Sequence, residues 1–403
     1  MLPEGYVVLN FEGNKAYIRR DRLWQLRRVC AAVFDCDGVL LDIRDSYNKA
    51  ISKVVAFVLE GLTGYPFPVD LVSDEIIFLF RKTGGFNNDW DTVYGVLMFV
   101  LSGLTEKLRG KLKRLLERTG RRQCAFERFF EVTQTAKEEL KSFGSGEGVF
   151  EGLAERLKGF ASLLDATGAA SVDRNLLTAS GWSEDFADYY KALKRFLYHS
   201  SEVGRSVIPT VFEEFFCGSG LFREMYGIEP RFCKDLGMVE NEKVIVQRET
   251  LGWLASIFGK HNLGIASGSR PQPAKHVMGD LLGKFRSEAL VFLDTMERAE
   301  RERSNKEGRY VSLKKPHPFS LLKAVEAFDP FDFVLYVGDS MEDAIMAREA
   351  AKVANHFLFV GVYHYTGLEQ SVLCSFLEAG CDMVIPSVNE LPSVLEALRR
   401  EKR

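Results

Sequence analysis

The sequence predicts an α/β fold, a doubly wound parallel sheet into which a large, mainly helical segment is inserted. Apolar runs of the kind found in strands buried on both faces alternate with helical stretches in the C-terminal part of the chain. A similar run, Val29 to Phe34, lies near the N-terminus. More than two hundred residues of mostly helical pattern separate it from the next one, which predicts the insertion.

The predicted elements follow in order along the chain. Residues 1–30 are predicted to form a hairpin extension that leans on the core, because Glu12-Gly13-Asn14 separates two short strand patterns. The core is expected over 31–42 and 261–403, and the helical insertion over 43–260. We expect core strands at 262–266, 289–293, 333–337, 357–361 and 383–385. Core helices are expected at 273–284, 318–327, 341–352, 368–379 and 390–402.

The insertion is expected to be helical at 49–62, 104–118, 126–141 and 186–196, with breaks at 144–148 and 218–220. Phe212, Phe215 and Phe216 are interpreted as its core. The irregular segment 160–185 and the charged segment 294–313 are predicted to be loops.

Composition limits the partners of the chain. The formal net charge is −3, which gives no electrostatic argument for nucleic acid or for a membrane surface. The seven cysteines form no CxxC pair, the N-terminus has no apolar leader, and no apolar run reaches the roughly 18 residues of a membrane span. These features predict a cytoplasmic protein with reduced thiols and no nucleic-acid or membrane partner. They do not indicate an oligomeric state.

Two carboxylates, Asp35 and Asp37, follow the apolar run that ends at Phe34, and Gly38 comes next. Ligands of parallel sheets bind beyond the carboxyl ends of the strands. Like charges crowded there are costly unless a cation or a reaction uses them. The alternative is a turn rich in Asp and Gly.

Three further polar clusters follow apolar runs or loops. Ser267 ends one predicted strand, Lys315 lies in Lys-Lys-Pro-His-Pro, and Asp339 and Asp343 follow another strand as Gly-Asp-x-x-x-Asp. In this order DxDGV, a strand-final Ser, KPxP and GDxxxD resemble the four motifs of the haloacid dehalogenase (HAD) superfamily. The resemblance implies a Rossmann-like core. It also implies that the insertion is a C1 cap, as in subfamily IA.

The resemblance implies a role for each motif residue. Asp35 would be a nucleophile that forms an aspartyl phosphate, and Asp37 an acid and base that protonates the leaving oxygen and later activates water. Members with this second Asp transfer phosphoryl groups rather than cleave carbon–halogen bonds. Ser267 and Lys315 would bind the phosphoryl oxygens. The alternatives are a turn role for Ser267 and Lys314 as the functional lysine.

A magnesium site is also implied, formed by Asp35, the main-chain carbonyl of Asp37 and Asp339. Asp343 would contact the metal directly or through a water molecule. The alternative for the segment that starts at Asp339 is a capped helix with an acidic first turn, and both interpretations can hold together.

The insertion carries a second resemblance, to a little-characterised subfamily IA group with a GGFNNDWD-like motif. Two glycines, two amides, a carboxylate and an indole in one short polar segment suit substrate recognition. The candidates are Lys82, Gly85, Asn87, Asn88, Asp89 and Trp90. The alternative is a capped helix start. The basic segment 107–122 either attracts an anionic substrate or is the solvated face of an amphipathic helix.

Together these features predict a Mg²⁺-dependent phosphatase that hydrolyses a small phosphomonoester metabolite through an aspartyl-phosphate intermediate. A phosphomutase of the same superfamily and a non-catalytic regulatory or binding protein on the same scaffold are the alternatives. Histidinol phosphate, sugar phosphates and phosphoglycerate-type esters all stay open as substrates.

Overall fold

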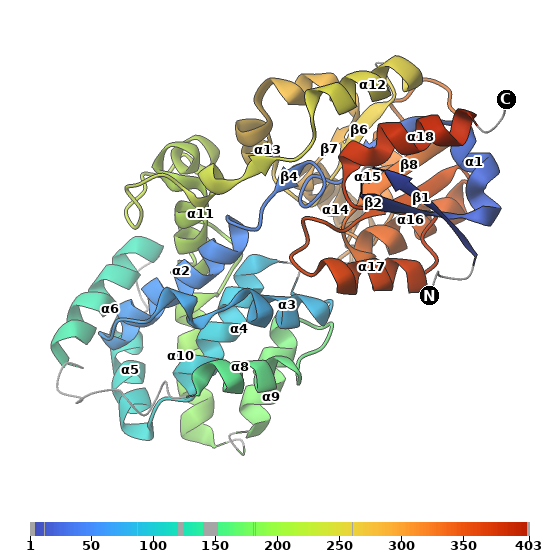
Figure 1. Cartoon of the computed structure of the whole chain (residues 1–403). Helices are drawn as coiled ribbons and strands as arrows, with labels where there is room; N and C mark the ends of the chain where they lie inside the picture. The colour runs from blue at the N-terminus through green and yellow to red at the C-terminus, as the bar shows by residue number, and fades with distance from the viewer. Residues whose placement is uncertain are drawn as a thin grey trace. The chain divides into compact units, whose positions relative to one another are not determined.

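The computed structural model describes residues 5–11, 13–86, 88–119, 124–139, 152–179, 181, 183–259 and 261–400. The chain forms two compact units (Figure 1). The core unit comprises Met1–Arg44 and Asn241–Arg403, and the insert unit comprises Asp45–Glu240. The insert unit ends before the predicted boundary at 260, because helix α12 (Arg248–Phe258) buries Leu251 and Leu254 in the core unit.

An eight-stranded sheet forms the centre of the core unit as far as the chain is described, in the order β1-β2-β10-β9-β8-β3-β6-β7. Strands β10, β9, β8, β3, β6 and β7 are parallel, which confirms the predicted α/β class. The strand bounds are β1 Tyr6–Phe11, β2 Asn14–Arg19, β3 Val29–Phe34, β6 Leu263–Ala266, β7 Leu290–Val291, β8 Phe333–Gly338, β9 Phe357–Val362 and β10 Met383–Ile385.

Helices cover both faces of this sheet (Figure 1). Ala32 and Phe34 of β3 share one apolar cluster with residues of α1, α12, α13 and α18. Ala31 and Val33 share the other cluster with residues of α15, α16 and α17. Burial on both faces explains why β3 is a continuous apolar run. The core helices not yet given are α1 Leu23–Arg27, α13 Pro271–Met278, α14 Leu293–Glu307, α15 Phe319–Val325, α16 Met341–Val353, α17 Glu369–Glu378 and α18 Leu391–Arg400.

The N-terminal hairpin is part of the sheet rather than an extension leaning on it. Strand β2 pairs antiparallel with β10, with Ile18 opposite Met383 and Tyr17 opposite Val384. Ile18 is completely buried, and Ala16 is nearly so. The chain therefore adds two antiparallel strands to one edge of the parallel sheet.

The prediction of a loop at 294–313 is wrong. Residues Leu293–Glu307 form helix α14, in which only Met296 and Glu300 are buried. A helix with so few buried positions has no apolar stripe for a sequence pattern to reveal. The buried Glu300 accepts hydrogen bonds from the main-chain N of Leu313 at 2.7 Å and from Ser312 Oγ at 3.2 Å.

The insert unit is helical, as predicted. Its described helices are α2 Tyr47–Thr63, α3 Asp74–Lys82, α4 Asp89–Ser102, α5 Glu106–Thr119, α6 Ala125–Glu139, α8 Leu153–Ala161, α9 Ala169–Ala179, α10 Glu184–Leu197 and α11 Val207–Tyr226. The prediction of a loop at 160–185 is wrong, because α9 and the start of α10 occupy much of this segment. The predicted break near Gly218 is confirmed by its φ of 71° inside α11, and the break at 144–148 lies outside the described residues.

Two further predictions concern the insert unit and the membrane. Phe212, Phe215 and Phe216 are buried, as expected of a core. Across the residues with a described placement, no helix is both long and apolar enough to cross a bilayer.

A short antiparallel pair, β4 (Leu41–Asp42) and β5 (Lys243–Val244), joins the two segments of the core unit.

We predict that Ile18→Ala lowers the free energy of unfolding by about 2–5 kcal/mol, because it leaves a cavity between the hairpin and the core. Urea-induced unfolding measures the change. Lys15→Ala, at an exposed position of the same strand, is the control and should change it by less than about 0.5 kcal/mol. Equal effects of the two substitutions would contradict the integration of the hairpin into the core.

Candidate active site

The predicted strand-end residues meet at one edge of the sheet, beyond the neighbouring strands β6, β3 and β8. The chain just past each strand continues the ladder, because Asp35 N donates to Val337 O at 2.8 Å and Ser267 N donates to Val291 O at 3.0 Å. Asp35 and Ser267 are 7% and 1% exposed. The site is therefore built on the rigid centre of the sheet.

Lys315 is the basic residue of this site, and Lys314 is exposed. The Nζ atom of Lys315 lies 2.8 Å from Asp35 Oδ1 and 2.7 Å from Asp343 Oδ1. Burial opposes the charge of the ammonium group, but the carboxylates of Asp343 and Asp35 together outweigh it and raise the pKa of Lys315. Lys315 is therefore protonated in the folded protein.

Asp343 holds Lys315 in place. Its Oδ1 atom accepts from Lys315 Nζ and from Tyr336 OH, both at 2.7 Å, and its Oδ2 atom accepts from Ser340 N at 3.2 Å and Ser340 Oγ at 2.7 Å. Burial would raise the pKa of this carboxyl, but Lys315 and the donors keep it below its usual value. With both oxygens engaged, Asp343 acts on the site mainly by orienting Lys315.

The capped helix predicted after Asp339 is also present. Ser340 is the N-cap of α16, and its hydroxyl accepts from Asp343 N at 3.2 Å while the Asp343 carboxylate accepts from the N–H of Ser340. This reciprocal capping box fixes the first turn of the helix. One carboxylate thus serves both the helix start and the site.

Tyr336 belongs to the site although the sequence did not single it out. Its ring is completely buried in β8, and its hydroxyl donates to Asp343 Oδ1. Lys315 Nζ lies 5.6 Å from the centroid of this ring. A buried tyrosine needs a partner for its hydroxyl, so its place three residues before Asp339 was the available signal.

Asp37 lies in a different environment from Asp35. Ser269 Oγ donates to Asp37 Oδ2 at 2.7 Å, and the Ser267 and Ser269 hydroxyl oxygens lie 3.0 Å apart. Ser269 was not predicted, although it stands in the same Ser-Gly-Ser segment as Ser267. The two aspartates therefore differ in their partners: Asp35 contacts the Lys315 ammonium group and the Ser267 hydroxyl, whereas Asp37 contacts the Ser269 hydroxyl.

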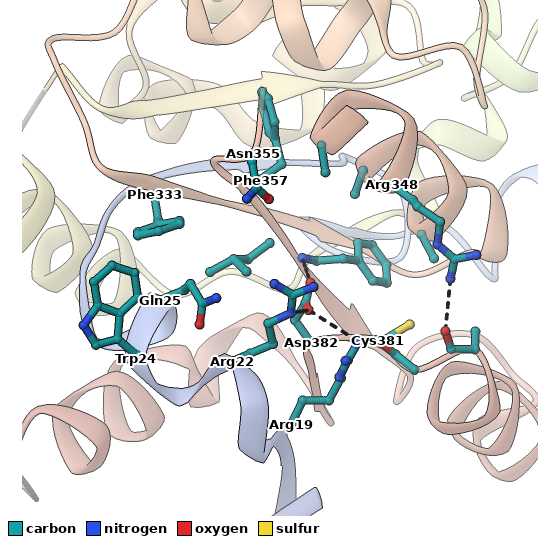
Figure 2. A pocket seen from close by; sticks show the side chains of 17 residues that line it. Arg19, Arg22, Trp24, Gln25, Phe333, Arg348, Asn355, Phe357, Cys381 and Asp382 are labelled. Atoms are coloured by element: carbon teal, nitrogen blue, oxygen red, sulfur yellow. Dashed lines mark hydrogen bonds and ion pairs between the residues drawn. The ribbon is translucent and has the colours of Figure 1, made fainter. Parts of the chain in front are cut away.

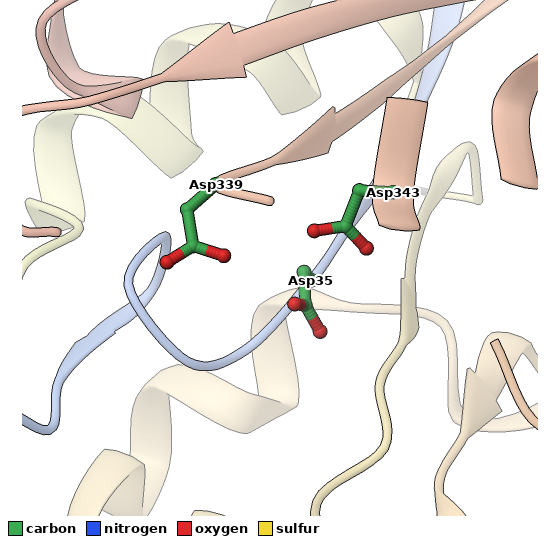
Figure 3. A group of neighbouring side chains, drawn as sticks. All are labelled: Asp35, Asp339 and Asp343. Atoms are coloured by element: carbon green, nitrogen blue, oxygen red, sulfur yellow. The ribbon is translucent and has the colours of Figure 1, made fainter. Parts of the chain in front are cut away.

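Three carboxylates form a group that could hold a metal ion (Figure 3). One oxygen from each of Asp35, Asp339 and Asp343 lies within 4.8 Å of the others. Gly38 makes this approach possible, since its φ is +71° and a Cβ atom there would lie 2.0 Å from Asp339 Oδ2. Any larger residue at position 38 would displace Asp339.

The electrostatics of this group fit a divalent cation. Burial, with the neighbouring carboxylates of Asp343 and Asp35, raises the pKa of Asp339 well above its usual value. Burial likewise raises the pKa of Asp35, against the attraction of Lys315. Among the described residues no group donates a hydrogen bond to the carboxylate of Asp339. Asp35 and Asp339 are thus the side chains that would hold Mg²⁺, which favours one or two carboxylates.

The candidate residues of the insert unit start helix α4. Asn88 is its N-cap and accepts from Trp90 N at 3.0 Å, Asp89 lies 2.8 Å from Arg81, and Trp90 Nε1 donates to Glu213 Oε1 at 3.1 Å. A Cβ atom on Gly85 would lie 2.5 Å from Gly168 N. These contacts give the segment a structural role, whatever its role in recognition.

Two of the candidates keep polar groups for a ligand, and one cannot be described. Lys82 and Asn88 are exposed, and no other described residue pairs with the Lys82 ammonium group or the Asn88 side-chain NH₂. Asn87 lies outside the described residues. Recognition of substrate by this segment stays a prediction.

Comparison with known proteins agrees with the site geometry. Residues 238–351, which include Ser267, Lys315, Asp339 and Asp343, match the model of the haloacid dehalogenase-like hydrolase family. This segment of the chain therefore resembles the haloacid dehalogenase-like hydrolases. The match supports the predicted superfamily, whereas the narrower GGFNNDWD-like group stays a prediction.

Two solved structures resemble this protein, and no curated protein matches it. One is an X-ray structure from the Northeast Structural Genomics Consortium, 17% identical with a TM-score of 0.65, covering 92% of this chain and 100% of that one. The other is the phosphatase Tt82 from Thermococcus thioreducens, 20% identical with a TM-score of 0.47, covering 87% of this chain and 98% of that one.

We predict that Asp339→Asn removes the stabilisation of the protein by Mg²⁺. A site that binds only the folded state gains about 2.7 kcal/mol at a ligand concentration of one hundred times Kd. Differential scanning calorimetry with Mg²⁺ or chelator measures the change in Tm. Asp70→Asn, at an exposed position, is the control and should keep the full Mg²⁺ response.

The same variant has an opposite effect without metal. Because the folded pKa of Asp339 is raised, its charge destabilises the fold increasingly as pH rises above the ordinary carboxyl value of about 4. In chelator at pH 8, Asp339→Asn should therefore have a higher Tm than the wild type, and the difference should shrink toward pH 5. A lower Tm at pH 8 would contradict this account.

Proposed function

We propose that the protein is a Mg²⁺-dependent phosphatase that hydrolyses a small phosphomonoester through an aspartyl-phosphate intermediate. The observation that carries this proposal is the pair of aspartates two residues apart, of which only Asp35 pairs with the buried Lys315. Asp35 lies 2.8 Å from Lys315, whereas Asp37 lies 2.7 Å from the hydroxyl of Ser269. Carboxylates in contrasting surroundings suit two different chemical roles.

In the first half-reaction Lys315 and Ser267 hold the oxygens of the phosphoryl group. A carboxylate oxygen of Asp35 attacks phosphorus, and the bond from phosphorus to the ester oxygen breaks in line with the attack. Asp37, protonated at this stage, gives its proton to the departing oxygen, so the product leaves as an alcohol. Bound Mg²⁺ would neutralise charge on the phosphoryl oxygens.

In the second half-reaction Asp37, now a carboxylate, takes a proton from a water molecule. The water oxygen bonds to phosphorus and the bond between phosphorus and the Asp35 oxygen breaks. Inorganic phosphate leaves, Asp35 is again a carboxylate and Asp37 is again an acid. Lys315 stays protonated throughout, because Asp343 remains a carboxylate 2.7 Å from its ammonium group.

Two alternatives use the same residues. A phosphomutase would return the phosphoryl group to a second position of the product, and stimulation of turnover by a bisphosphate would distinguish it. A regulatory protein on this scaffold would need no intact site, so the buried Lys315–Asp35 ion pair favours an enzyme. A small phosphorylated metabolite as the partner, a cytoplasmic location and the absence of nucleic-acid and membrane partners all stay predictions.

We predict that Asp35→Asn lowers kcat at least 100-fold, because an amide is no anionic nucleophile. A panel of phosphomonoesters, assayed with Mg²⁺ by phosphate release, identifies the substrate and measures the loss. Asp42→Asn is the control, since Asp42 is close in sequence but pairs with Arg44 at 2.7 Å, outside the carboxylate group. If Asp35→Asn keeps more than about a hundredth of the activity, Asp35 is not the nucleophile.

We predict that the amide of Asn88 reads the leaving portion of the true substrate. Asn88→Ser keeps an oxygen that can cap α4 but removes the amide, whereas Asn88→Ala removes both. Each should lower kcat/KM for the best substrate of the panel by roughly 10-fold or more, about 1.4 kcal/mol. Hydrolysis of p-nitrophenyl phosphate, which offers nothing to recognise, should change much less.

The two variants separate recognition from folding. Loss of an N-cap typically lowers the free energy of unfolding by about 1 kcal/mol. If only Asn88→Ala loses activity, and its stability falls by that amount, Asn88 acts only as a cap. Equal losses on both substrates would place the segment in catalysis or folding instead.

A further inference from the structure

A cavity lies in the core unit, away from the aspartates. It encloses about 420 Å³ and is bounded by the segment 19–25, the side of α16 and the first residues of β8 and β9 (Figure 2). Phe333 and Phe357, which begin these strands, line it, whereas Asp339 follows the last residue of β8. The six residues of β8 span about 20 Å, so the two sites lie at opposite ends of one strand.

The charge of the cavity is positive. Its lining holds the guanidinium groups of Arg19, Arg22 and Arg348 and a single carboxylate, that of Asp382. Asp21, which does not line the cavity, accepts two hydrogen bonds from the Arg19 guanidinium and neutralises its charge. Asp382 already accepts from Phe359 N at 2.9 Å and lies 3.1 Å from Arg22 Nε. Its single charge cannot balance both remaining arginines.

Arg22 has bonding capacity left over. Its Nε atom is buried and forms an ion pair with Asp382, but the angle between them does not make a hydrogen bond. In the described parts of the chain nothing pairs with its two terminal nitrogens. Arg348, from α16, uses one nitrogen to donate to Ala379 O at 3.0 Å, which leaves others for a ligand. Planar guanidinium groups with free donors suit an oxyanion.

The other wall of the cavity is apolar and in part aromatic. Ala344, Ala347 and Ala351 lie along one side of α16, and Phe333 lies near them. Trp24 packs edge-on against Phe333, with ring centroids 5.7 Å apart, yet 55% of it is exposed. The Arg28 guanidinium lies 4.6 Å from the centre of the Trp24 ring, so the small residues of α16 and Phe333 are the apolar surface that leaves room for a flat group.

We propose that this cavity binds a small organic anion, in which a carboxylate or phosphate group is attached to a flat apolar or aromatic portion. The anionic group contacts Arg22, with Arg348 adding positive charge to the same lining, and the apolar portion lies against the alanines of α16. The volume is within the roughly 300–1,000 Å³ of small-molecule sites. The inference does not depend on the proposed phosphatase activity, because none of the lining residues is among the motif residues.

The test is a titration of the full chain with benzoate in chelator, followed by ligand-observed NMR. Benzamide has the same ring without the charge and is the ligand control. We expect saturable binding of benzoate and none of benzamide. No saturation by about 20 mM benzoate, or equal binding of the two compounds, would overturn the proposal.

Two variants test the two parts of the proposed site separately, its guanidinium group and its apolar wall. Arg22→Met removes the guanidinium group but keeps an apolar stem, and should raise the Kd for benzoate at least 10-fold. Arg20→Met is the matched control, since Arg20 is exposed in the same helical turn and does not line the cavity. Ala351→Phe fills the apolar wall while leaving the arginines, and should also abolish binding.

Lys315→Met separates this cavity from the aspartate site, where benzoate could pair with the lysine. Benzoate binding that survives Lys315→Met but not Arg22→Met supports the proposal. The reverse pattern overturns it. Thermal unfolding of each variant confirms that the protein is folded before titration, and Ala351→Phe decides the matter if Arg22→Met is not.

Discussion

Burying several carboxylates around a single ammonium group is the constraint on which the rest of the structure depends. Asp35, Asp339 and Asp343 converge at one end of the sheet, and Lys315 contacts two of them. Charges removed from water are stable only when paired and hydrogen-bonded. The site therefore has a deficit of positive charge. Burial, together with the neighbouring carboxylates, raises the pKa of Asp35 and Asp339, and this is the reason that a cation fits there.

The surrounding residues maintain this arrangement without taking part in it. Tyr336 and Ser340 saturate Asp343, so that Asp343 can orient Lys315. Glu300 of α14 accepts a hydrogen bond from Leu313 N, two residues before Lys315, and so anchors the loop that delivers the lysine. Gly38 leaves the space that Asp339 occupies. Each contact holds a side chain in its position, and a small displacement of that side chain would disturb the geometry of the site.

The site was largely predictable from the sequence because its residues stand at fixed positions relative to strands. The apolar runs before Asp35, Ser267 and Asp339 showed where strands end, and parallel strands bring their ends together. The order of the strands, and the addition of the hairpin to the sheet, depends on pairings far apart in sequence, such as Ile18 with Met383. No local pattern contains that information.

Other features were missed for identifiable reasons. Helix α14 is polar on nearly all sides, so its pattern resembles a solvated loop. Tyr336 lies within an apolar run, so the sequence pattern predicts only a buried aromatic side chain and not a hydroxyl at the site. The arginine-lined cavity joins residues from both ends of the chain, Arg22 and Asp382 among them, which only the folded sheet brings together. For the segment around Asn88, the sequence could not separate capping from recognition, since both use the same polar groups.

The central position of β3 has a consequence for how the chain acquires its structure during synthesis. Strand β3 leaves the ribosome well before its two neighbours, β6 and β8, which are made more than two hundred residues later. Meanwhile its apolar residues have no sheet to join, whereas the intervening helices can form from local contacts. The apolar strand that precedes Asp35 therefore stays without its partners until β6 and β8 have been synthesised.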